Sequence, residues 1–82
     1  MPAPNQPVDQ ALPAVLRRLR EARGLSQEAT ARAADIALNT YSRIERGQTS
    51  PSWPTVRQLA DALGVSMGEL GTAIDAENST PP

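Results

Sequence analysis

Polar side chains that can bind nucleic acid recur on one side of the segment 38–46. Asn39, Arg43 and Arg46 fall on one face of a helix that turns about 100° per residue. Tyr41 and Ile44 fall on the opposite face. Asparagine and arginine can pair with the edges of bases, and arginine also with phosphates, because each presents several hydrogen-bonding groups at once. A solvated helix face has the same pattern, so this segment alone leaves both interpretations open.

The composition excludes most catalytic chemistry. The 82-residue chain has no Cys and no His, and all eight of its basic residues are arginines. Thiolate and imidazole metal ligands, Ser–His dyads and Schiff-base lysines are therefore excluded. We expect no catalytic residue, no metal and no cofactor, and a binding protein rather than an enzyme. No segment indicates a site for a small-molecule ligand.

The distribution of charge permits a nucleic-acid partner although the net charge of the chain is −1. Every arginine lies within residues 12–70, and these residues carry a net charge of +2. The remaining acidic residues lie near the two ends. Phosphate binding depends on where positive charge is concentrated rather than on the total charge.

Neither a membrane span nor an export signal is predicted. No stretch approaches the roughly 20 apolar residues that cross a bilayer. Residues 1–10 lack the basic and hydrophobic runs of a signal peptide. We therefore expect a cytoplasmic, nucleoid-associated protein with no membrane partner.

Apolar periodicity predicts an all-α fold, a compact five-helix bundle. The expected helices cover residues 12–23, 26–34, 38–46 and 54–63, and a fifth begins at Ser66. One domain is expected at 11–75, between a disordered N-terminal arm at 1–10 and a disordered C-terminal tail at 76–82. The apolar residues at helical spacing form the predicted core, which comprises Leu16, Leu19, Ile36, Tyr41, Ile44, Val56, Leu59, Leu63 and Leu70.

The only tryptophan, Trp53, stands where the fourth predicted helix begins. We interpret it as a core residue beneath the loop 47–52, and the alternative is a stacking contact with a base or a partner. The second and third predicted helices are separated by three or four residues. Two helices joined by so short a turn indicate a helix-turn-helix.

Three segments at their present spacing resemble the lambda-repressor/Cro-like (XRE) helix-turn-helix family. They are LRRLREARGLSQ at 16–27, YSRIERG at 41–47 and LADALGV at 59–65, and the resemblance covers residues 12–70. It implies a five-helix bundle whose third helix enters the major groove of double-stranded DNA. It also implies a sequence-specific transcriptional regulator, a repressor, that acts as a homodimer.

The resemblance also implies roles for individual residues. Those that would read bases are Leu38, Asn39 and Arg43. Those that would contact the DNA backbone are Gln27, Thr40, Arg46 and Gln48. Arg20 and Glu45 match a pair of residues that ties the first helix to the third.

Apolar residues of the fifth helix are the best candidates for a dimer contact, namely Met67, Leu70 and Ile74. The arginines of the first helix could form a phosphate patch, mainly at Arg20 and Arg23, or could be simply solvated.

Three positions depart from the family pattern. Thr30 stands at a usual core leucine, Asp35 at a usual turn glycine, and Ala37 at a usual Ser or Thr helix cap. These departures affect the angle at which the third helix would enter DNA. The alternative function is a protein-interaction module, such as an antitoxin, that binds a partner protein and contacts DNA secondarily.

Overall fold

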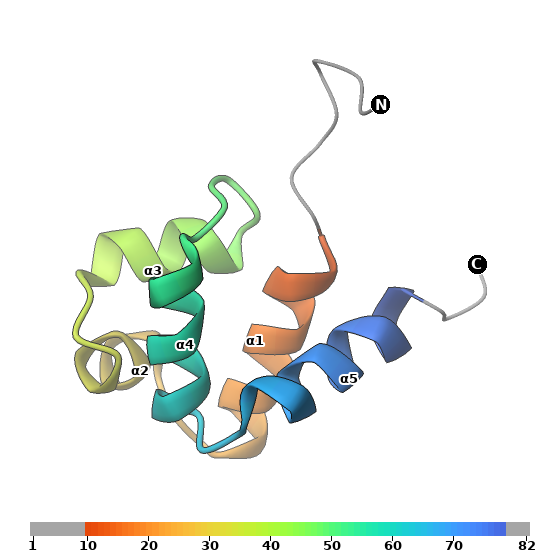
Figure 1. Ribbon diagram of the computed structural model, residues 1–82. Coiled ribbons are helices and arrows are strands. Elements are labelled where there is room, and N and C mark those ends of the chain that lie inside the picture. Colours follow the sequence, from red (N-terminus) through yellow and green to blue (C-terminus); the bar gives the residue numbers. More distant parts are fainter. Residues whose placement is uncertain (1–9, 79–82) are drawn as a thin grey trace.

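The computed structural model describes residues 10–78, and this part of the chain forms five helices and no strand (Figure 1). The helices are α1 (Ala11–Ala22), α2 (Gln27–Ala33), α3 (Leu38–Glu45), α4 (Trp53–Ala62) and α5 (Met67–Asn78). The predicted all-α fold is confirmed, with α2 and α3 as the two helices of the helix-turn-helix. Figure 1 shows α3 and α5 at opposite sides of the molecule, with α1 and α4 between them.

Two apolar clusters hold the helices together. The larger contains buried residues of α1, α3 and α4, together with the small side chains of Ala31 and Ala34. The smaller joins α1, α4 and α5 through Val15, Ala60 and Leu70. Of the predicted core residues, most are fully buried, namely Leu16, Tyr41, Ile44, Leu59, Leu63 and Leu70. The others are half-buried against these clusters, namely Leu19, Ile36 and Val56.

The turn between α2 and α3 tolerates both of its unusual residues. Asp35, at the usual turn glycine, adopts the left-handed conformation, with φ of 60°, which aspartate accepts better than most residues. Ala37 occupies the N-cap position of α3 and makes no side-chain cap hydrogen bond. By contrast, Ser26 caps α2 by accepting a hydrogen bond from the backbone N–H of Ala29 at 3.0 Å. Because α3 lacks a cap worth about 1 kcal/mol, its position depends more on packing.

Thr30 fits the core without leaving a polar group unpaired. It is fully buried, and its hydroxyl donates to the carbonyl oxygen of Ser26 at 3.0 Å. Buried polar groups cost little when they are hydrogen-bonded within the protein. The replacement of the usual leucine therefore leaves the fold unchanged.

Helix α5 is longer than predicted. It begins with a reciprocal cap in which Ser66 Oγ accepts from the Glu69 N–H and Glu69 Oε1 accepts from the Ser66 N–H. It continues to Asn78, so residues 76–78, which we expected in the disordered tail, are helical. Glu77 forms an ion pair with Arg18 of α1, and this contact stabilises the last turn. The rest of the predicted tail, and the predicted arm except Gln10, lie outside the described residues.

The prediction that Trp53 is a core residue is wrong. Its side chain is 67% exposed. Trp53 is the first residue of α4, and burial of this helix begins only at Thr55 and Val56. The tryptophan therefore lies outside the apolar clusters.

No helix among residues 10–78 is long and apolar enough to cross a bilayer.

Candidate nucleic-acid interface

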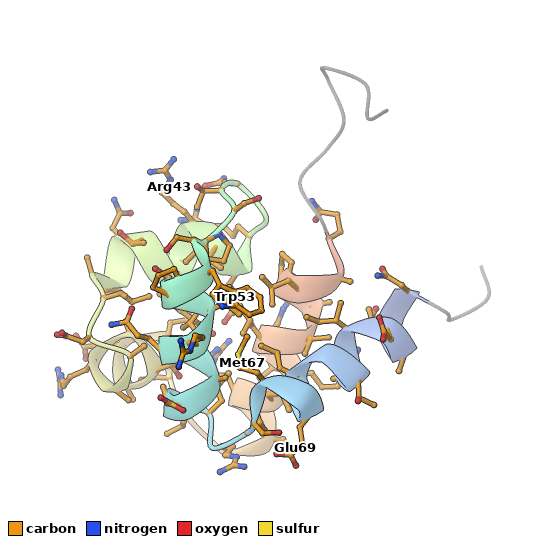
Figure 2. The ribbon with its side chains drawn as sticks, in the orientation of Figure 1. Arg43, Trp53, Met67 and Glu69 are labelled. Atoms are coloured by element: carbon orange, nitrogen blue, oxygen red, sulfur yellow. The ribbon has the colours of Figure 1, made fainter. Side chains whose placement is uncertain are left out.

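The outward face of α3 carries the residues predicted to read bases. Leu38, Asn39 and Arg43 are exposed, and Leu38 is 43% exposed despite its apolar side chain. Figure 2 shows Arg43 pointing from α3 away from the rest of the molecule. Within residues 10–78, the side chains of Asn39 and Arg43 make no hydrogen bond or ion pair. Their donors and acceptors are therefore available to a partner.

The inward face of α3 is fixed by burial. Tyr41 and Ile44 are at most 1% exposed, and Glu45, at 5%, is also buried despite its charge. Helix α3 thus has one face committed to the core and one face left open.

A pair of charged residues joins α1 to α3. Arg20 Nε donates to Glu45 Oε2, and Arg20 Nη2 donates to Glu45 Oε1, both at 2.8 Å. The third nitrogen, Nη1, donates to the carbonyl oxygen of Leu25 at 2.8 Å. This two-point geometry constrains orientation as well as distance. The predicted pairing of Arg20 with Glu45 is therefore present, and its side chains are only 13% and 4% exposed.

Gln27 extends this pair into a network that includes α2. Its Nε2 donates to Glu45 Oε1 at 3.0 Å, and its Oε1 accepts from the Ser42 hydroxyl at 2.8 Å. Ser42 was not among the predicted site residues, because its partner depends on how α2 crosses α3. One N–H of the Gln27 amide remains for the DNA backbone contact predicted for this residue, which stays a prediction.

The network changes how its members ionise. Burial opposes ionisation of Glu45, but the hydrogen bonds from Arg20 and Gln27 outweigh it and lower the pKa of this carboxyl. Burial, and then the neighbouring Glu45 carboxylate, raise the pKa of Tyr41. The Tyr41 hydroxyl has no hydrogen-bond partner among the described residues. Glu45 is therefore the charged centre of the network, and Tyr41 stays neutral.

The other predicted backbone contacts lie around the outward face of α3. Thr40, Arg46 and Gln48 are exposed. Arg46 Nε donates to the carbonyl oxygen of Ser42 at 3.3 Å. The Gln48 N–H donates to the carbonyl oxygen of Arg43 at 2.9 Å, which holds the start of the following loop against α3. Thr40, Arg46 and Gln48 are therefore accessible to a partner, whereas Gln27 of α2 is partly buried.

Comparison with known proteins decides the family. A family model described as a helix-turn-helix domain matches residues 11–72. The chain belongs to the helix-turn-helix domain family. The resemblance predicted from the three sequence segments is thereby confirmed.

Two relatives of this helix-turn-helix domain are named as regulators of transcription. The HTH-type transcriptional regulator DdrOP3 of Deinococcus deserti is 42% identical over 55 residues, which are 67% of this chain and 43% of that protein. The cryptic phage CTXphi transcriptional repressor RstR of Vibrio cholerae is 42% identical over 55 residues, 67% of this chain and 50% of that protein. The matched region thus spans about half the length of these relatives.

A solved structure supports the same assignment. The clp gene regulator ClgR from Corynebacterium glutamicum superposes with a TM-score of 0.79 at 26% identity. The match covers 89% of this chain and 78% of that chain. The fold of this helix-turn-helix domain therefore extends over nearly all the described residues.

Two arginines of α1 that were candidates for a phosphate patch, Arg20 and Arg23, make contacts within this helix-turn-helix domain. Arg20 is neutralised by Glu45. Arg23 Nη2 donates to the carbonyl oxygen of Gly64 at 3.4 Å, in the α4–α5 turn, which lies far from α3 in Figure 1. Both side chains thus have partners within residues 10–78, and the phosphate patch centred on Arg20 and Arg23 stays a prediction.

The three candidate dimer residues of α5 differ in exposure. Leu70 is 1% exposed and belongs to the core of its own chain. It therefore has no accessible surface for a second copy, and the prediction that Leu70 is a dimer contact is wrong. Met67 and Ile74 are half-buried against the same cluster. Figure 2 shows Met67 and the exposed Trp53 on the same visible side of the molecule.

Proposed function

We propose that this helix-turn-helix domain binds double-stranded DNA sequence-specifically, with α3 in the major groove, and acts as a transcriptional repressor. The observation that carries the proposal is the asymmetry of α3. Asn39 and Arg43 are exposed and unpaired within residues 10–78, while Tyr41, Ile44 and Glu45 are buried. The names of the relatives, a transcriptional regulator and a transcriptional repressor, support the same function.

Each exposed residue has a partner that suits its chemistry. Arginine binds guanine with two hydrogen bonds, asparagine binds adenine in the same way, and an apolar side chain contacts the methyl group of thymine. Arg43, Asn39 and Leu38 would supply these contacts. Gln27, Thr40, Arg46 and Gln48 would contact phosphates, which position the protein without specifying sequence.

A homodimer follows from the shortness of one recognition helix. A single α3 reads only a few base pairs, too few to define a site among the competing sequences of a genome. Two copies would read half-sites about one helical turn apart, through a contact that includes Met67 and Ile74. We place the protein in the cytoplasm, on the nucleoid.

The test begins with DNA fragments that the protein selects from a random pool. We expect the selected fragments to share a short motif that occurs twice. The binding of the selected DNA is then measured by fluorescence anisotropy for Arg43→Ala and for a matched control, Arg57→Ala, which removes an exposed arginine from α4. Arg43→Ala should weaken binding by about 1–3 kcal/mol and relax the preference at one base position.

The control separates base reading from general charge. Arg57→Ala removes the same charge but leaves the outward face of α3 unchanged. It should therefore retain the base preference. If Arg43→Ala binds every sequence as the parent does, the proposed function is wrong. If a partner protein then loses binding to Arg43→Ala, the antitoxin-like function takes its place.

A further inference from the structure

A hollow of about 610 Å³ adjoins the outward face of α3. It lies between the first half of α1, the start of α2 and the end of α3, and its lining includes Arg17, Arg20 and Arg46. Gln27 and Glu45 also line it. The hollow is continuous with the proposed DNA-binding surface, because Arg46 belongs to both.

The arginines that line this hollow are not equivalent. The charge of Arg20 is neutralised by the two hydrogen bonds it donates to Glu45. Arg17 and Arg46 are exposed and form no ion pair within residues 10–78. Arg46 uses only Nε, on the carbonyl oxygen of Ser42, which leaves both of its terminal nitrogens. Among the described residues, two positive charges of the hollow therefore have no ion-pair partner.

Arg18, the next residue after Arg17, has a different environment. It forms an ion pair with Glu77 of α5 and does not line the hollow. Successive residues of a helix point about 100° apart, so two adjacent arginines serve different faces of α1. Of these two arginines, only Arg17 lines the hollow beside the end of α3.

We propose that Arg17, together with Arg46, binds a phosphate of the DNA backbone at this hollow, so that α1 contributes to the DNA-binding surface. The inference rests on the proposed function and adds a contact to it. Arginine suits a phosphate because its planar guanidinium donates two parallel hydrogen bonds. The partner is polyanionic DNA because the hollow is positive and adjoins the helix that carries Asn39 and Arg43.

The experiment compares Arg17→Ala with Arg18→Ala, two adjacent substitutions that change the net charge equally. Affinity for selected and unrelated DNA is measured by anisotropy over a series of salt concentrations. Arg17→Ala should weaken binding to both DNAs about tenfold at low salt, the loss of one charge-assisted contact. The slope of log affinity against log salt should fall by about one unit, since one phosphate fewer is neutralised. Arg18→Ala should leave the slope unchanged.

Two further variants make the outcome decisive. Arg17→Lys retains the charge and should recover most of the slope but not all of the affinity. If Arg17→Ala and Arg18→Ala behave alike while Arg43→Ala loses its base preference, the Arg17 contact is wrong and the proposed function stands. If Arg43→Ala also binds like the parent, the proposed function is wrong and the Arg17 contact falls with it. Far-UV circular dichroism checks that each variant is folded.

Discussion

Helix α1 meets α3 and α5 through two junctions that are built differently. At the junction with α3, Arg20 and Glu45 form two 2.8 Å hydrogen bonds between side chains that are only 13% and 4% exposed. At the junction with α5, the ion pair of Arg18 and Glu77 lies at the surface, with side chains 60% and 31% exposed. The main contact between α1 and α5 is apolar, through Val15 and Leu70.

The difference indicates what each junction controls. Apolar packing brings two helices together but is not directional. Hydrogen bonds of fixed geometry also set rotation and register. The junction with α3 therefore orients the helix that carries Asn39 and Arg43, while the junction with α5 mainly buries apolar surface. Gln27 and Ser42 extend the directional contacts to α2.

The largest expected effect is at the junction with α3. Arg20→Ala leaves the buried Glu45 carboxylate without its main partner, which should lower the free energy of unfolding by about 3–5 kcal/mol. Arg18→Ala, at the exposed pair, should lower it by only about 0–1 kcal/mol. Urea denaturation followed by circular dichroism measures both. Equal losses for the two variants would show that the junctions do not differ as described.

The junction with α5 should respond to loss of apolar volume. Leu70→Ala removes a side chain that is 1% exposed and should cost about 2–5 kcal/mol. The half-buried Ile74, substituted by Ala, should cost less. Under conditions where Leu70→Ala remains folded, its base preference on selected DNA should equal that of the parent. A changed preference would mean that α5 helps to orient α3.

The smallest expected effect is a change in the free energy of unfolding with pH. Burial raises the pKa of Glu45, but hydrogen bonds, chiefly those from Arg20, and the charge of Arg20 together outweigh burial and lower this pKa below its usual value of 4.5. The stabilisation from Glu45 is therefore fully present above about pH 4.5 and is lost as the pH falls through the lowered pKa of the folded state, because the unfolded chain binds a proton more readily.

Glu45→Gln should flatten this acidic limb when the free energy of unfolding is measured from pH 7 to pH 3. Glu69 provides the comparison, because its pKa is lowered by the backbone and side-chain hydrogen bonds of Ser66 while it remains exposed. Glu69→Gln should leave most of the slope in place. An acidic limb of unchanged steepness in Glu45→Gln would contradict the role given to this carboxylate.

Much of the fold could be predicted from the sequence because turns, helix caps and buried helix faces depend on residues close together in the chain. The left-handed Asp35, the uncapped Ala37 and the cap formed by Ser66 and Glu69 each depend on a few neighbouring residues. Stripes of apolar residues likewise predicted the buried faces of α1, α3 and α4. The pairing of Arg20 with Glu45 came from the family resemblance, because residues so distant in sequence give no local signal.

The remainder depends on how the helices cross. The hydrogen bond between Gln27 and Ser42 requires the angle at which α2 crosses α3, and the ion pair of Arg18 with Glu77 requires α5 to pack beside α1. Trp53 was misplaced because aromatic residues are commonly buried, whereas this one stands at the exposed first residue of α4. The separate roles of Arg17 and Arg18 required the hollow, which no pattern of residues along the chain defines.

The most direct test of the central claim is a titration of the ¹⁵N-labelled protein with selected DNA, followed by backbone amide chemical shifts. If the outward face of α3 is the recognition surface, the largest changes should occur at Leu38, Asn39 and Arg43, with smaller ones at the start of α2 and the end of α3. Residues in the middle of α5 should change little. Changes concentrated in α5, with the amides of α3 unperturbed, would contradict the account.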